Sequence, residues 1–108
     1  MKIEVLGFAG CPNFPSAVQR ARAAMQRIGV NADIDAIDIQ GDEAAHRAYF
    51  LGSPSVRVNG LDVECAARTL VDFGFGCRTY FVNGERQGLP PQTWIEAAIR
   101  EAIQNENI

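Results

Sequence analysis

The order of hydrophobic periods in the first half of the chain constrains the fold most. Residues 2–8, with apolar Ile3, Val5, Leu6 and Phe8, suit a buried strand, and residues 17–28 carry an apolar stripe with the helical period. Residues 30–39 alternate apolar and acidic side chains, as a half-buried strand does. Residues 42–51 are expected to form a short helix, which Gly52 ends. The pattern predicts a β-α-β-α unit with a parallel strand pair.

The second half begins with a strong hairpin signal. Apolar and polar residues alternate on both sides of Asn59-Gly60, the residue pair that favours a type I′ turn. Three elements are expected after this hairpin: a helical turn at 66–71, a strand at 79–82 that turns at Asn83-Gly84, and a final helix with its apolar stripe at 95–103. We therefore predict one α/β domain, residues 1–108, with a central mixed sheet.

Composition narrows the class of partner and the compartment. The chain has 108 residues, 47% of them hydrophobic and 21% charged, with a net charge of −3. This acidic balance argues against nucleic acid as a partner, because phosphate binding needs surplus lysine and arginine. No apolar run is long enough to cross a bilayer, and the first residues do not resemble a signal peptide. We expect a cytoplasmic protein with no membrane partner.

The three cysteines suggest reactive thiols rather than a structural framework. An odd number of cysteines cannot form a closed set of disulfides, and a reducing compartment keeps them as thiols. No two are spaced as Cys-x-x-Cys, and the chain has only one histidine, His46, which is expected on the surface. We therefore expect no structural zinc site, no metal ligand set and no cofactor.

Cys11 is the sharpest candidate for chemistry. It lies between the first predicted strand and the first helix, where unpaired N–H groups and the helix dipole favour a thiolate. Pro12 helps to fix the turn that presents the sulfur. The thiolate is the form that attacks disulfides and binds soft metals. The alternative is a partly buried cysteine that packs as a small hydrophobic residue.

A second motif, Ser53-Pro54-Ser55, directly precedes the hairpin. With the β-α-β-α order, the Cys-Pro at the first strand–helix junction and the last helix, it resembles the thioredoxin/glutaredoxin superfamily. The resemblance implies a thioredoxin-like fold, with a cis peptide bond at Pro54 facing Cys11. It also implies that Ser53 offers backbone hydrogen bonds to an extended partner. Pro12 and Asn13, beside the cysteine, are expected to contact the substrate.

The sequence departs from that family's usual Cys-x-x-Cys pair. Phe14 stands where the second cysteine would be, so Cys11 is a monothiol that cannot resolve a mixed disulfide within its own motif. Cys77, Cys65 or glutathione remain as resolving thiols. Cys77 is the better candidate, because it follows a glycine-rich segment and precedes a charged arginine. Cys65 is expected to pack at the end of the hairpin.

A narrower resemblance links three pieces of the chain to small thioredoxin-like proteins labelled alkylmercury-lyase-like. These pieces are residues 10–13, 52–64 and 77–80. The label implies soft-metal or organomercurial handling by thiolates. A lyase needs two thiolates and a carboxylate that protonates the leaving carbon, and Asp62 and Asp72 are the acids nearest to Cys65 and Cys77 in sequence.

Three functions follow from these residues. The first is thiol–disulfide exchange through Cys11, with Pro54 shaping the groove and a small thiol or a protein disulfide as substrate. The second is capture of a soft metal ion such as Hg(II) or Cu(I) by two thiolates, which needs Cys77 close to Cys11. The third is a thioredoxin-like module that binds peptides without chemistry. We favour the first, since one helix-terminal thiolate suffices for it.

Overall fold

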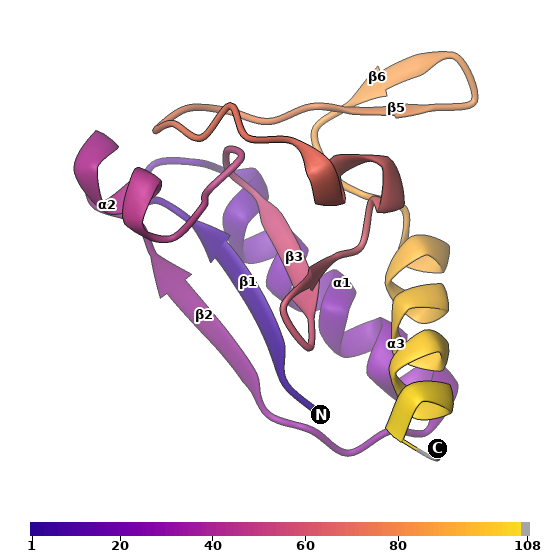
Figure 1. Cartoon of the computed structure of the whole chain (residues 1–108). Helices are drawn as coiled ribbons and strands as arrows, with labels where there is room; N and C mark the ends of the chain where they lie inside the picture. Colours follow the sequence, from indigo (N-terminus) through magenta and orange to yellow (C-terminus); the bar gives the residue numbers. More distant parts are fainter. Residues whose placement is uncertain (107–108) are drawn as a thin grey trace.

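The computed structural model describes residues 1–106 and contains a four-stranded mixed sheet with strand order β2-β1-β3-β4 (Figure 1). β1 pairs with β2 in parallel and with β3 in antiparallel fashion, and β3 forms a hairpin with β4. The predicted mixed sheet is therefore confirmed. The strands are β1 Ile3–Gly7, β2 Ile34–Asp38, β3 Ser55–Val58 and β4 Leu61–Asp62.

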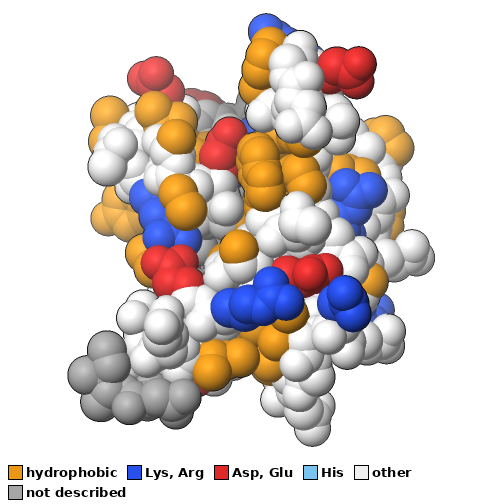
Figure 2. Space-filling view, turned by 90° about the vertical axis from the view of Figure 1, so that its right-hand side faces the viewer, with side chains coloured by type: hydrophobic (Ala, Val, Ile, Leu, Met, Phe, Trp, Pro, Cys, Tyr) orange, Lys and Arg blue, Asp and Glu red, His pale blue; other side chains and the backbone are white. Residues whose placement is uncertain are grey.

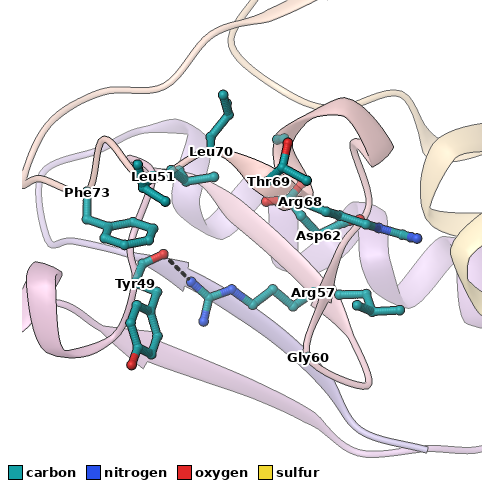
Figure 3. Close-up of a pocket in the computed structure, with 12 residues that line it drawn as sticks. Tyr49, Leu51, Arg57, Gly60, Asp62, Arg68, Thr69, Leu70 and Phe73 are labelled. Carbon is teal, nitrogen blue, oxygen red and sulfur yellow. Dashed lines mark hydrogen bonds between the residues drawn. The ribbon is translucent and has the colours of Figure 1, made fainter.

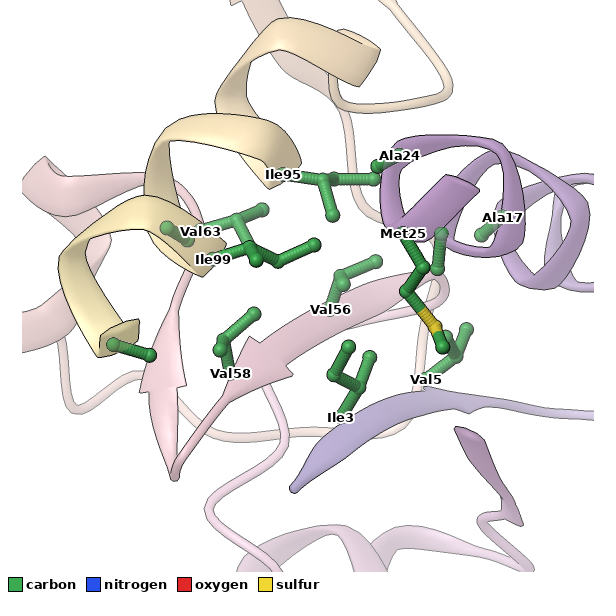
Figure 4. Close-up of a cluster of buried hydrophobic side chains, with 13 residues drawn as sticks. Ile3, Val5, Ala17, Ala24, Met25, Val56, Val58, Val63, Ile95 and Ile99 are labelled. Carbon is green, nitrogen blue, oxygen red and sulfur yellow. The ribbon is translucent and has the colours of Figure 1, made fainter. Parts of the chain in front are cut away.

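One face of the sheet is covered by two helices, α1 Asn13–Ile28 and α3 Gln92–Glu106 (Figure 1). The alanines of α1 turn toward the sheet and toward α3, because their small side chains allow the backbones to approach closely. The resulting core is drawn in Figure 4. In this core the side chains of the sheet and of the residue after β4 pack against those of α1 and α3. Its members are Ile3, Val5, Val56, Val58 and Val63; Ala17, Ala21, Ala24 and Met25 of α1; and Ile95, Ala98, Ile99 and Ala102 of α3.

The opposite face carries α2, Asp42–Arg47, over a smaller cluster of Leu6, Ile39, Ala45 and Phe50. The helix is shorter than predicted. Tyr49 has a positive φ of 55°, a conformation that an α-helix does not use, so the chain leaves the helix before Leu51. The predicted strand at 30–39 is likewise shortened to β2.

Residues 65–91 bring the chain across one end of the sheet. A 3₁₀ helix, η1 Cys65–Thr69, confirms the predicted turn, and β5 Tyr80–Val82 pairs with β6 Glu85–Gln87 in a separate hairpin. Between η1 and β5 the chain crosses the end of the sheet at which α1 begins (Figure 1). Within residues 1–106 no helix is long and apolar enough to span a membrane.

Candidate functional site

Cys11 lies where the sequence places it, in the turn between β1 and α1. Its N–H donates to the carbonyl oxygen of Phe8 at 3.2 Å, and its own carbonyl accepts the N–H of Phe14 at 3.1 Å. Pro12 is the N-cap and Asn13 the first residue of α1. The side chain of Cys11 is buried, with 6% of the residue exposed. The thiol therefore stands at the positive end of a 16-residue helix but is largely closed to solvent.

The Ser53–Pro54 peptide bond is cis, as the resemblance implies. Both residues are buried, and the Ser53 hydroxyl has no hydrogen-bond partner among the described residues. This hydroxyl lies against Gly7, where an added Cβ would come within 2.8 Å of Oγ and would also overlap the ring of Phe14. Ser53 therefore presents an unused hydroxyl to the junction of β1 and α1.

The backbone of Ser53 is already paired within the chain. Its N–H donates to the carbonyl oxygen of Gly76 at 2.8 Å, and its carbonyl accepts the N–H of Arg78 at 2.9 Å. These two bonds form an isolated parallel bridge between Ser53 and Cys77. In this structure both backbone groups of Ser53 are therefore occupied by the chain itself and not offered to a partner. A segment of the same chain takes that position.

We call residues 75–80 the strap. Its side chains alternate, with Arg78 and Tyr80 buried and Cys77 exposed. The ring of Phe75 packs against that of Phe8 at a tilt of 39°, with 4.7 Å between the ring centroids. Further along, Gly88 meets the side-chain amide of Asn13 so closely that an added Cβ would overlap it. The strap and the chain after it thus contact the turn on both sides of Cys11.

Arg78 fastens the strap to the hairpin β3–β4 through a buried ion-pair network. Its guanidinium donates to both carboxylate oxygens of Asp62, at 2.7 and 3.0 Å, and to Glu64 at 3.0 Å. A further bond of 3.0 Å reaches the hydroxyl of Ser55. Burial alone would lower the pKa of Arg78, but the hydrogen bonds and charge of Asp62 outweigh it and raise that pKa.

Tyr80 makes the second attachment of the strap. Its hydroxyl donates to the carbonyl oxygen of Pro54 at 2.5 Å, and the guanidinium of Arg78 lies 4.5 Å from the centre of its ring. Burial is the main cause that raises the pKa of the Tyr80 phenol, so the hydroxyl stays protonated as a donor. We call Arg78, Tyr80 and their hydrogen-bond partners the clasp.

Sequence reasoning missed the clasp. It considered Asp62 only as an acid near Cys65, and it expected the charge of Arg78 to serve the thiol of Cys77. In the structure the guanidinium is occupied by Asp62 and Glu64. The signal available was the two-residue spacing of Arg78, directly before the strand predicted at 79–82, and Tyr80 within it, which puts both side chains on one face of an extended segment.

Cys65 was expected to pack at the end of the hairpin, but it is exposed. It is the first residue of η1. Beside it a cavity of about 510 Å³ lies between η1 and α3, with Trp94 in its wall and the ion pair of Arg68 and Glu101 at its edge. Seen from the side of α3, hydrophobic side chains gather below the projecting β5–β6 hairpin, with charged side chains around them (Figure 2). His46 is exposed, as predicted.

A second cavity, of about 380 Å³, lies between residues 49–51 and the β3–β4 hairpin (Figure 3). Arg57 crosses its floor and donates to the carbonyl oxygens of Ala48 and Tyr49 at 2.9 and 2.7 Å. Burial lowers the pKa of Arg57. None of the three cysteines lines this cavity, so it is separate from the thiol chemistry predicted at Cys11.

Among residues 1–106, no cluster of three or more histidine, cysteine or acidic side chains is arranged to hold a metal ion. The three thiols are free in this structure. Asp62, one of the two acids considered for protonating a leaving carbon, is held by Arg78. Asp72 is exposed on the segment between η1 and the strap.

Comparison with known proteins gives no relative for this chain: no family model, no curated protein and no solved structure matches it.

Proposed function

We propose that the chain carries out thiol–disulfide exchange, with Cys11 as the attacking thiol and Cys77 as the resolving thiol. The pairing of Cys77 with Ser53 carries this proposal. Residues directly paired across two strands place their side chains on the same face. The Ser53 side chain faces Gly7 and Phe14 near the start of α1, so this pairing supports a Cys77 side chain directed toward the end of the sheet where Cys11 lies.

In the proposed exchange, two thiols of the protein reduce one disulfide of the substrate. The Cys11 thiolate attacks one sulfur of the substrate, forms a mixed disulfide and releases the other sulfur as a thiolate. The Cys77 thiolate then attacks the Cys11 sulfur and releases the second substrate thiolate. The substrate gains two electrons, and the protein is left with a Cys11–Cys77 disulfide. Two molecules of a small thiol of the glutathione class then reduce that disulfide: the first forms a mixed disulfide with one cysteine, and the second attacks it and leaves as the disulfide of the small thiol.

Ser53 adds a polar group to this site. Its hydroxyl is 1% exposed and has no partner in the chain. Buried hydroxyls normally find a partner, because an unsatisfied one costs about 1–3 kcal/mol. A thiolate or a substrate sulfur held at the junction of β1 and α1 would accept a hydrogen bond from it.

The proposed substrates are small disulfides and protein disulfides, and the proposed compartment is the reducing cytoplasm. A thioredoxin-like arrangement of the fold is part of the same proposal. It is supported by the parallel pair β1–β2, whose strands α1 connects along the chain, and by the antiparallel pairing of β3 with β1, which makes the sheet mixed. Phe14 stands where a second cysteine of the motif would be, so a resolving thiol that belongs to the chain must come from outside α1.

Trapping the mixed disulfide tests this function. The variant Cys77→Ser, incubated with glutathione disulfide, is expected to accumulate glutathione on Cys11, because the resolving thiol has been removed. The unmodified chain should pass on to the internal disulfide, and the matched control Cys65→Ser should do the same. Peptide mapping by mass spectrometry identifies the modified cysteine. Glutathione on Cys65 alone, or a Cys11→Ser variant that reacts like the unmodified chain, would contradict the proposal.

Soft-metal capture is the alternative that the same pairing favours. Two thiolates brought together by this pairing would suit a linear Hg(II) or Cu(I) ion. This function predicts one tightly bound Hg(II) per chain, lost in Cys11→Ser and in Cys77→Ser but kept in Cys65→Ser. We do not propose carbon–mercury cleavage, because Asp62 is bound to Arg78.

A further inference from the structure

The strap takes the place of a partner at the thiol site. Its residues Gly76 and Arg78 use both backbone groups of Ser53, and Gly52 allows this close approach, since an added Cβ there would lie 2.9 Å from the Cβ of Arg78. Cys11 is buried in the same structure. A disulfide carried by a polypeptide therefore cannot reach Cys11 along Ser53 while the strap is in place.

The strap is held at few points. Its pairing with the sheet is a single bridge, not a continuous ladder. At its first residue the strap contacts Phe8 through the ring of Phe75, whose N–H donates to Asp42 at 3.3 Å. At its other end the clasp holds it: the buried guanidinium of Arg78 on Asp62, Glu64 and Ser55, and the hydroxyl of Tyr80 on Pro54. Single bridges break more easily than long ladders, because each hydrogen bond contributes little to stability by itself. Phe75 is 45% exposed whereas Arg78 and Tyr80 are buried, so the clasp is the attachment that opening of the strap must break at the greatest cost.

We propose that Arg78 and Tyr80 are positioning residues that keep the strap closed over Cys11 and hold Cys77 beside Ser53. Opening of the strap admits a protein disulfide to Cys11. Closure returns Cys77 to the position from which it resolves the mixed disulfide. The inference rests on the proposed thiol exchange and adds to it a selection by size: small disulfides react with the closed form more readily than protein-sized ones.

Two mild variants test the clasp without removing the buried ion pair of Arg78 and Asp62. Tyr80→Phe deletes the hydroxyl bonded to Pro54, and Glu64→Gln weakens the outer contact of Arg78. Matched controls make the same changes at exposed positions, Tyr49→Phe and Glu43→Gln. Tyr80→Phe is expected to react about fivefold faster at Cys11 with a polymer-linked maleimide, since one net hydrogen bond is lost from the closed form. Glu64→Gln should react faster by a smaller factor, because the side-chain oxygen still accepts from Arg78 but the charge is lost. Reaction with iodoacetamide, which is small, should change less.

Two further readouts separate positioning from general loosening of the fold. Hydrogen exchange at the Ser53 and Arg78 amides should speed up about fivefold in the clasp variants, while amides of the β1–β2 pair keep their protection. With glutathione disulfide, the clasp variants should accumulate more mixed disulfide at Cys11, because Cys77 is held less well. The controls should match the unmodified chain in all three measurements.

The outcomes distinguish the two proposals. Equal rates with both reagents in clasp variants and controls, together with normal exchange at Cys11, would overturn the role of the clasp and leave thiol exchange standing. A Cys11 that forms no mixed disulfide even in the clasp variants would overturn the exchange function and the clasp role with it. Faster maleimide reaction confined to Tyr80→Phe and Glu64→Gln supports the role of the clasp, and mixed disulfide at Cys11 in the same variants supports the exchange.

Discussion

Replacing Arg78 with methionine is expected to lower the free energy of unfolding by about 3–5 kcal/mol, the cost of breaking one partner out of a buried ion pair. The substitution keeps an unbranched chain of similar length but leaves the carboxylate of Asp62 buried at 7% exposure without its cation. Denaturation by urea, followed by circular dichroism, measures the change. The matched control Arg100→Met lies on an exposed position of α3 and should stay within about 0.5 kcal/mol of the unmodified chain.

A double variant tests whether the loss comes from the stranded carboxylate. Arg78→Met combined with Asp62→Leu replaces the pair by apolar side chains, an exchange that is often nearly neutral in buried sites. Glu64 is partly exposed and is solvated without Arg78, and Ser55 keeps its bond of 2.6 Å to the carbonyl of Gly52. The double variant should therefore recover most of the lost stability. A single variant that costs no more than Arg100→Met would contradict the ion-pair account.

Replacing Gly52 with alanine is expected to cost about 2–4 kcal/mol, because strained backbone and overlap act together. Gly52 has a φ of 116°, and an added Cβ would lie 2.9 Å from the Cβ of Arg78 and 3.2 Å from its backbone nitrogen. Gly60→Ala is the matched control. Gly60 also has a positive φ, of 81°, but nothing lies within 4 Å of its Cβ position, so only the backbone strain of about 1–2 kcal/mol applies.

The two glycine variants should also differ in which part of the chain is destabilised. Because the overlap at Gly52 falls on the strap, Gly52→Ala should also speed hydrogen exchange at the Arg78 amide, and Gly60→Ala should not. Equal costs for the two glycine variants would mean that the strap does not press on Gly52 as the structure has it.

Local patterns were enough to predict most of the framework. The alanine stripe of α1, with Gly29 as its left-handed C-cap at a φ of 82°, follows directly from helical spacing. The two Asn-Gly turns appear where the sequence puts them, with positive φ at Asn59 and Asn83. The position of Cys11 between a strand and a helix also required only neighbouring residues.

The features that were missed depend on contacts between distant residues. The bridge between Ser53 and Cys77 spans 24 positions and involves one residue on each side, so no periodic pattern announces it. The network of Arg78 reaches Ser55 and Asp62, 23 and 16 positions away. α2 ends early because Phe50 is drawn into the cluster with Leu6 and Ile39, which requires the sheet to be present.

Mapping the first disulfide that forms within the unmodified chain tests the central claim most directly. The chain would be equilibrated in glutathione buffers of increasing oxidising strength, and each disulfide quantified by peptide mapping at every step. A disulfide needs its two Cα atoms about 4.4–6.8 Å apart, so only cysteines that the fold brings together can pair within one chain. We predict a single Cys11–Cys77 disulfide as the first product, absent in Cys77→Ser and unchanged in Cys65→Ser. A Cys65–Cys77 disulfide, or disulfides only between chains, would contradict the account.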